Sequence, residues 1–210
     1  MKYVYCSGPI FCPEEVAGLT AIANVLEEAG YGTFLPTRDG LERFVLGLID
    51  SPLNTNLLGI RERTHRAIFA LDVFQIVERC DSYVMNMNGR VPDEGSVAEA
   101  AIAFSTGKPV VFYKNDRRAP FLGDDNSMLL GLSMLAPVDD MKKLPAAIVK
   151  AEKKMGKLAV SARPPLPENL EQVVRQGEKV WAALGSKAAS KLGKKETDEL
   201  VKEIVEAVRQ

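Results

Sequence analysis

Short apolar segments alternate along this chain with longer amphipathic ones, and this order restricts the fold more than any other feature. Apolar, strand-like segments are typical of the buried strands of a parallel sheet, and they are predicted at residues 2–6, 33–35, 82–87 and 109–113. The segments between and after these strands have helical periodicity. Helices are therefore predicted at residues 13–29, 59–79, 96–106, around 127 and at 139–155. This order predicts a three-layer α/β/α fold, flavodoxin-like or Rossmann-like, with a parallel sheet and right-handed crossovers.

The composition changes near residue 157. Three prolines, at positions 164, 165 and 167, indicate a linker, and two amphipathic helical segments follow it. We therefore predict a catalytic domain at residues 1–157 and a helical extension at residues 158–210, which docks on that domain or on a partner subunit. The basic stretch at 185–195 is typical of a solvated surface or linker. Residues 41–56, apolar but broken by Ser51-Pro52, indicate a short helix and a loop that could serve as a lid.

The overall charge and the cysteine pattern limit the possible partners. The 210 residues carry a net charge of -1, which implies no general attraction to nucleic acid or to an anionic membrane. No apolar run approaches the ~18 residues that a membrane span needs. The three cysteines lack the spacing of metal ligands, and two of them lie in apolar segments. This pattern fits a reducing cytosol. We expect no metal site and no cofactor. The absence of a signal peptide also favours a cytoplasmic location.

The stretch from Pro92 to Glu99 follows a predicted strand and opens a predicted helix. Ligands of open α/β sheets sit beyond the carboxyl ends of the strands, where such turns lie. We expect Glu99 in the first helical turn, where free N–H groups and the helix dipole would hold it ionised as a candidate nucleophile. The alternative is structural, because Ser96-x-x-Glu99 also matches a capping box in which the two side chains bond each other's backbone N–H groups.

Three residues at the end of the first predicted strand are candidates for the same sheet edge. Tyr5 could donate a hydrogen bond to a carboxylate, or could be an ordinary core tyrosine. Gly8 would let a ligand approach the backbone, although the glycine spacing of a phosphate loop is missing. Phe11 could stack on a planar ligand, or could belong to the core.

Asp72, Asn126 and His65 are the remaining polar residues whose place in the fold has to be weighed against a functional role. Asp72 lies in an otherwise apolar helical segment, so it is either an exposed helix residue or a buried acid that could act as a general acid. Asn126 precedes Ser127 and fits an ordinary helix N-cap. His65, the only histidine, is expected on a solvated helix face, and it cannot complete a triad or a metal site with anything visible in the sequence.

Taken together, these segments resemble the nucleoside 2-deoxyribosyltransferase family. The resemblance covers about residues 1–150 in order, and no piece beyond about residue 158 takes part. The matching pieces are Tyr5-x-x-Gly8-Pro9-x-Phe11, Leu35-Pro36-Thr37, Asp72-Val73-Phe74-Gln75-Ile76, Gly89-Arg90-Val91-Pro92-Asp93-Glu94-Gly95 with Glu99, Gly107-Lys108-Pro109, and Asn126 before Met128.

The resemblance implies a role for each matched residue. Glu99 would attack the anomeric carbon and expel the nucleobase, and Tyr5 would orient it. Asp93 would help to hold the substrate, and Asn126, lent by a neighbouring subunit, would bind sugar hydroxyls. Asp72 is the nearest match to the acid beside the base. The implied partners are nucleosides, free nucleobases and further copies of the chain in a homo-oligomer with shared sites.

The chain departs from the family pattern at three points. Asp72 and Asp81 are nine positions apart where family members usually have eight, so either the helix adjusts locally or Asp72 points elsewhere. Ala101 stands where glycine is frequent, and Asn88 stands where aspartate is common.

Three functions are compatible with these residues. The first is transfer of a 2-deoxyribosyl group between nucleobases through a glutamyl-sugar ester, in nucleoside salvage. The second is hydrolysis of nucleoside 5'-monophosphates by a related N-glycosidase. Relatives of that kind carry serines at positions 93 and 126, and Asp93 would repel the phosphate in a low-dielectric site. The third is a nucleotide-binding module without catalysis.

Overall fold

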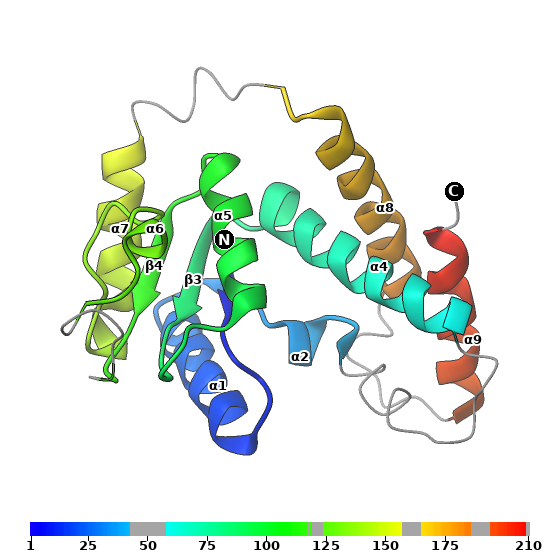
Figure 1. Ribbon diagram of the computed structural model, residues 1–210, viewed down its shortest axis with the longest axis horizontal. Coiled ribbons are helices and arrows are strands. Elements are labelled where there is room, and N and C mark those ends of the chain that lie inside the picture. The colour runs from blue at the N-terminus through cyan, green and yellow to red at the C-terminus, as the bar shows by residue number, and fades with distance from the viewer. Residues whose placement is uncertain (43–57, 117, 119–123, 157–164, 186–193, 209–210) are drawn as a thin grey trace. The chain divides into compact units, whose positions relative to one another are not determined.

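The computed structural model describes residues 1–42, 58–116, 118, 124–156, 165–185 and 194–208 (Figure 1). This part of the chain divides into two compact units. Unit 1 comprises Met1–Leu35 and Arg79–Pro165, and unit 2 comprises Pro36–Glu78 and Leu166–Gln210. Most of the predicted segment 41–56 and of the basic stretch 185–195 lies outside the described residues.

Unit 1 is built on a parallel sheet of four strands. They are β1 (Tyr3–Ser7), β2 (Gly32–Phe34), β3 (Ser82–Asn86) and β4 (Val110–Tyr113), in the order β2-β1-β3-β4. All three pairings are parallel, and Tyr5 lies opposite Tyr83 in the register of β1 and β3. The predicted strands and their parallel arrangement are confirmed. The order is that of the flavodoxin-like sheet, whose switch point lies between β1 and β3.

Helices cover both faces of this sheet. On one face, α1 (Pro13–Glu28) and α7 (Leu144–Met155) pack on alternate strand residues, among them Val4, Cys6 and Val84. On the other face lies α5 (Glu94–Ser105), which contacts β3 and β4. The arrows of β3 and β4 point to the end of unit 1 at which α1 begins (Figure 1). Short helical turns, α6 (Ser127–Leu130) and η3 (Met141–Lys143), precede α7.

Unit 2 is helical. It contains the short α2 (Pro36–Asp39), α4 (Leu58–Phe74), α8 (Glu168–Leu184) and α9 (Lys194–Ala207). A buried apolar cluster joins α4, α8 and α9, with Ala67, Leu71, Val180, Leu184, Leu200, Ile204 and Val208. The helices α4 and α8 approach closely at Gly177, where an added Cβ would lie 2.0 Å from the carbonyl oxygen of Ala70.

Helix α4 continues into a π-helix, η2 (Gln75–Arg79), immediately before β3. A π-helical turn accommodates an extra residue within a helix. The π-helix lies between Asp72 and Asp81, so a local adjustment of the helix is present in the nine-residue interval between them.

Candidate active site

Three hydroxyl groups from two neighbouring strands surround the carboxylate of Glu99. Tyr5 Oη donates to Oε1 at 2.8 Å, and Ser7 Oγ donates to Oε2. Tyr83 Oη lies 3.4 Å from Oε2. Glu99 comes from α5, so the cluster joins this helix to β1 and β3 at the switch point of the sheet.

The strand geometry explains why these hydroxyls converge. Side chains two positions apart on a strand point to the same face, so Tyr5 and Ser7 both face α5. The register sets Tyr83 beside Tyr5, and the two rings stack with centroids 5.7 Å apart. Tyr5 also stacks on Phe34 of β2 at 5.4 Å. Tyr5 is thus both a core tyrosine and a donor to a carboxylate, which combines the two interpretations of the sequence.

The hydroxyl donors favour the ionised form of Glu99, because hydrogen bonds to a charged acceptor are stronger than neutral ones. Burial raises the pKa of Tyr83 well above its usual value, and the negative charge of Glu99 raises that pKa further. Tyr83 therefore stays a neutral donor. Its shortest hydrogen bond, at 2.7 Å, goes to the backbone oxygen of Ser96.

Helix α5 begins differently from the capping box that the sequence suggests. Asp93 is the N-cap, and its Oδ2 accepts from Ser96 N at 2.7 Å and from Ser96 Oγ at 2.8 Å. The predicted capping box is wrong, because Asp93 provides the N-cap three residues before Ser96. Aspartate is among the residues preferred at an N-cap. Glu99 consequently lies in the second turn, not the first. The helix dipole acts mainly within the first turn, so the hydroxyls are the principal stabilising contacts of its charge.

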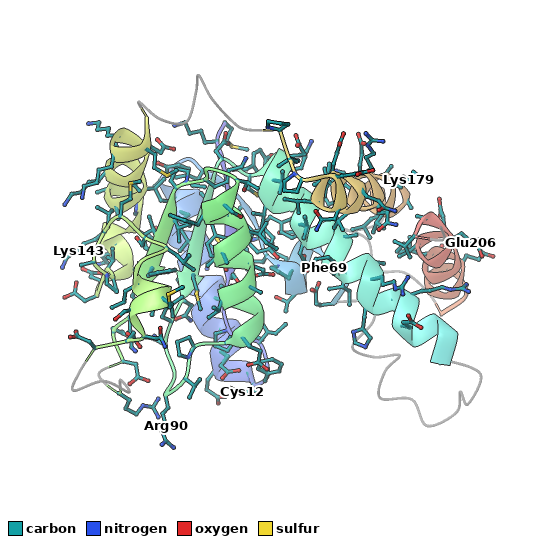
Figure 2. The ribbon with its side chains drawn as sticks, turned by 45° about the horizontal axis from the view of Figure 1, so that its top comes forward. Cys12, Phe69, Arg90, Lys143, Lys179 and Glu206 are labelled. Atoms are coloured by element: carbon teal, nitrogen blue, oxygen red, sulfur yellow. The ribbon has the colours of Figure 1, made fainter. Side chains whose placement is uncertain are left out.

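Gly8 and Phe11 follow β1 at the same end of unit 1. An added Cβ at Gly8 would lie 2.8 Å from Cβ of Asn86, so the glycine is needed for the packing of β1 on β3. Phe11 is 80% exposed, so it is not a core aromatic. Cys12, next along the chain, and Arg90, on the loop after β3, also lie at this end (Figure 2).

Asn126 caps α6, as the structural interpretation predicted. Its Oδ1 accepts from Met128 N at 2.8 Å, and the residue is exposed. The preceding Asp125 is buried and pairs with buried Lys114 at 2.6 Å, which fixes this loop to the end of β4. The role of Asn126 in sugar binding, as a residue lent by a neighbouring subunit, stays a prediction.

Asn88 ties the loop after β3 to the loop after β4. Its Oδ1 accepts from the backbone N–H groups of Asn115 and Asp116, at 3.0 and 3.1 Å. Its Nδ2 donates to Oδ1 of Asn115 at 2.8 Å. An aspartate, common at this position in the family, lacks that amide donor.

Asp72 lies on α4 in unit 2, and it is buried rather than exposed, with 8% of its surface accessible. Its role as the acid beside the base stays a prediction. His65, in contrast, is exposed on the same helix, as expected.

Sequence reasoning missed Ser7, Tyr83 and Ser96 as members of the cluster. The two-residue spacing of Tyr5 and Ser7 was a usable signal, because it sets both on one face of a strand. Tyr83 could be placed beside Tyr5 only with the register of β1 and β3. In the described part of the chain, no group of three or more His, Cys, Asp or Glu side chains could hold a metal ion.

Fold and site together define a flavodoxin-like α/β protein that presents one hydroxyl-bound carboxylate at the strand ends. Residues 4–155 match the family model described as nucleoside 2-deoxyribosyltransferase. The chain belongs to this family, and the resemblance found in the sequence is confirmed.

Several solved structures are similar to the chain, including the following two. One is a 2-desoxiribosyltransferase from Leishmania mexicana, at 18% identity and a TM-score of 0.44, and the other is a conserved protein from Enterococcus faecalis V583, at 16% and 0.45. Each alignment covers 71% of this chain and 98% of the other. No curated protein matches the chain. Among the described residues, no helix has the length and apolarity needed to cross a membrane.

Proposed function

We propose that this chain transfers a 2-deoxyribosyl group between nucleobases, with Glu99 as the nucleophile. The observation that carries the proposal is the 2.8 Å hydrogen bond from Tyr5 Oη to Glu99 Oε1. It orients a carboxylate at the switch point of the sheet, where ligands of such folds bind. Membership in the deoxyribosyltransferase family supports the same reaction.

The reaction proceeds in two displacements. A carboxylate oxygen of Glu99 forms a bond to C1' while the C1'–N bond breaks and its electron pair leaves with the base. The base takes a proton from an acid, for which Asp72 or a water is the candidate. A nitrogen of the second base then attacks C1' and releases Glu99, so the configuration is retained.

We propose nucleosides rather than their 5'-phosphates as substrates. Oδ2 of Asp93 is held by Ser96, which fixes the carboxylate at the start of α5. An ionised Asp93 a few ångströms from a 5'-phosphate would cost more than ~1 kcal/mol, a preference of about tenfold or more. The test compares initial rates on deoxyadenosine and deoxycytidine with those on their monophosphates. Faster cleavage of the monophosphates would refute the preference for nucleosides and would favour the second function, hydrolysis of nucleoside 5'-monophosphates.

The decisive experiment incubates the protein with deoxynucleosides and a mixture of free bases, and resolves the products by chromatography. We expect new deoxynucleosides, and a 2-deoxyribosyl adduct on Glu99 in mass spectra of acid-quenched protein. Glu99→Ala should abolish both. Glu94→Ala is the matched control, because Glu94 is an exposed acid of the same helix. Base exchange by a folded Glu99→Ala variant would refute the assignment of Glu99 as the nucleophile. If the wild type binds nucleosides but forms no product, the chain is a binding module without catalysis.

We also propose that the active form is a homo-oligomer with shared sites, in which Asn126 serves a neighbouring subunit. Light scattering should give at least a dimer at micromolar concentration. Glu99→Ala and Asn126→Ala subunits, each inactive alone, should regain activity when mixed, because a mixed oligomer contains one intact site. An active monomer would contradict shared sites.

A further inference from the structure

Ser7 holds one oxygen of the proposed nucleophile from a buried position at the end of β1. The residue is 3% exposed, and its Oγ donates a hydrogen bond to Oε2 of Glu99. The same Oγ lies 2.7 Å from Oγ of Ser96, which stands on the helix that carries Glu99. All of these atoms belong to unit 1. A serine hydroxyl has one hydrogen, so Ser7 can turn it toward either neighbour.

The oxygens around Ser7 differ in charge. Oε2 of Glu99 is charged when the carboxylate is ionised. The hydroxyl oxygen of Ser96 is neutral, as is that of Tyr83, which also takes part in a hydrogen bond with Ser7. A hydrogen bond to an ionised acceptor is roughly twice as strong as one between neutral groups. The hydrogen of Ser7 therefore points to Glu99 as long as this side chain is ionised.

Ser96 provides Ser7 with a second acceptor. Its own hydroxyl hydrogen points to Oδ2 of Asp93, at 2.8 Å, so its oxygen can accept from Ser7. When the charge on Glu99 is removed, the hydroxyl of Ser7 can turn to this neutral oxygen. Asp93 stays ionised throughout, as the preference for nucleosides over their 5'-phosphates requires.

We propose that Ser7 stabilises the free nucleophile relative to the covalent intermediate, and thereby promotes the release of Glu99 in the second displacement. The inference rests on the proposed function. When an oxygen of Glu99 bonds to C1', the C1'–N electron pair leaves with the base, which takes its proton from the acid, and the carboxylate becomes a neutral ester. Whichever oxygen forms the bond, Oε2 loses its charge and Ser7 loses a charge-assisted hydrogen bond.

The second displacement restores this hydrogen bond. A nitrogen of the incoming base bonds to C1', and the electron pair of the C1'–O bond returns to Glu99. The carboxylate that leaves regains the charge to which Ser7 donates, so Glu99 is a better leaving group than it would be without this contact. Ser7 acts on the sugar only through Glu99, so it is a positioning residue. Its effect keeps the ester from accumulating and favours transfer of the sugar.

The first test measures the 2-deoxyribosyl adduct on Glu99 at equilibrium. The protein is mixed with deoxyadenosine and adenine at fixed ratios, quenched in acid and analysed by intact-protein mass spectrometry. In Ser7→Ala, the ratio of base to nucleoside at which half of the protein carries the adduct should be about 5- to 10-fold higher than in the wild type. A loss of orientation alone would slow formation and breakdown of the ester together. An unchanged or lower ratio would therefore overturn the proposal.

Two further variants protect this test. Ser7→Cys keeps a small side chain with a weak S–H donor, so its ratio should lie between those of the wild type and Ser7→Ala. Ser82→Ala is the matched control, because Ser82 is a buried serine of β3 whose Oγ lacks a hydrogen-bond partner in the described structure. It should keep the wild-type ratio, and a shift as large as that of Ser7→Ala would contradict a specific role of Ser7.

The second test needs no substrate. Glu99→Gln replaces the carboxylate by a neutral group of the same shape, as ester formation does for its charge. In urea denaturation at pH 7, Ser7→Ala should lower the folding equilibrium constant about 5- to 10-fold more in the wild-type background than in the Glu99→Gln background. Equal losses in the two backgrounds would overturn the preference of Ser7 for the charged form.

The two tests separate this inference from the proposed function. A wild type that shows the coupling of Ser7 to the charge of Glu99, but forms neither adduct nor new deoxynucleoside, would refute the transferase. Base exchange with an unshifted adduct ratio in Ser7→Ala would leave the transferase and refute the role of Ser7.

Discussion

Tyr5 Oη donates a 2.8 Å hydrogen bond to Oε1 of Glu99 across 94 positions of the sequence. The bond connects the first strand of the sheet to the helix that follows the third. Tyr5 is fully buried, and its ring is held between Phe34 and Tyr83. The packing of the ring therefore fixes the position of the hydroxyl group. Through its hydrogen bond, this hydroxyl in turn orients the carboxylate of Glu99.

Replacing Tyr5 by Phe should slow base release in a single turnover on the order of 10- to 100-fold, because small misplacements of a reacting group are costly. Tyr83→Phe is the matched control, since its ring stacks in the same way. Its hydroxyl is 3.4 Å from Glu99, so the rate loss should be smaller. The loss of its 2.7 Å hydrogen bond to the backbone oxygen of Ser96 should lower stability by about 0.5–1.5 kcal/mol. Equal rate losses in the two variants would show that Tyr5 has no special role in orienting Glu99.

The buried pair of Lys114 and Asp125 should be sensitive to the loss of one partner. Lys114→Met leaves an uncompensated buried charge and should lower the free energy of unfolding by about 3–5 kcal/mol. The double variant Lys114→Met, Asp125→Leu should recover most of this loss in urea denaturation. The exposed pair of Lys143 and Asp139 is the comparison, where Lys143→Met should change the free energy of unfolding far less than Lys114→Met does, because water screens exposed charges. Additive losses in the double variant would contradict a coupled pair.

Gly177→Ala should destabilise the protein although alanine is the better helix former. The gain in helix propensity is about 1 kcal/mol. The new methyl group, however, would lie 2.0 Å from a backbone oxygen of α4, so the helices must separate, at a cost of about 1–3 kcal/mol or more. Gly18→Ala in α1 is the control, because its Cβ would meet only the side-chain amide of Asn86 at 3.4 Å and should stabilise. Thermal denaturation followed by circular dichroism compares the two, and a stabilised Gly177→Ala would refute the close contact.

The burial of Glu42 should make the free energy of unfolding depend on pH. The residue is buried, its Oε2 has no hydrogen-bond partner in the described structure, and burial raises its pKa above the ordinary value of 4.5. The native state thus holds this proton more tightly than the unfolded state. Stability from Glu42 is complete below pH 4.5 and is lost as the pH rises through the raised pKa.

Glu42→Gln removes that ionisation, so its advantage over the wild type in urea denaturation should grow from about pH 4 to about pH 8. Glu178→Gln, at an exposed position of α8, should show no such trend. A constant difference between Glu42→Gln and the wild type across this range would mean that Glu42 titrates normally.

The sequence predicted the sheet well, because buried parallel strands are nearly continuous apolar runs and stand out from amphipathic helices. It predicted Glu99 and Tyr5 as candidates for one site, and the structure brings them into contact. The start of α5 was harder to predict from the sequence. Asp93 and Ser96 are both good N-cap residues, and only the backbone conformation decides which of them begins the helix.

The hydroxyls of Ser7 and Tyr83 depend on the register of β1 and β3, which a local pattern does not encode. The packing of α4 on α8 is a second example. Both segments are amphipathic helices, and amphipathicity predicts that a face is covered without naming the partner. The π-helix before β3 was foreseen only as a need for local adjustment.

The pairing of α4 with α8 also has a consequence for synthesis on the ribosome. Proteins are made from the N-terminus at about 5–20 residues per second, and domains generally fold as units as they emerge. The strands and helices of unit 1 are complete once α7 has left the ribosome, while the apolar face of α4 must wait for α8 and α9. A nascent chain thus passes through a stage with a finished sheet and an uncovered helix. At that stage the apolar face of α4 is exposed surface of the kind that promotes association between incompletely folded chains.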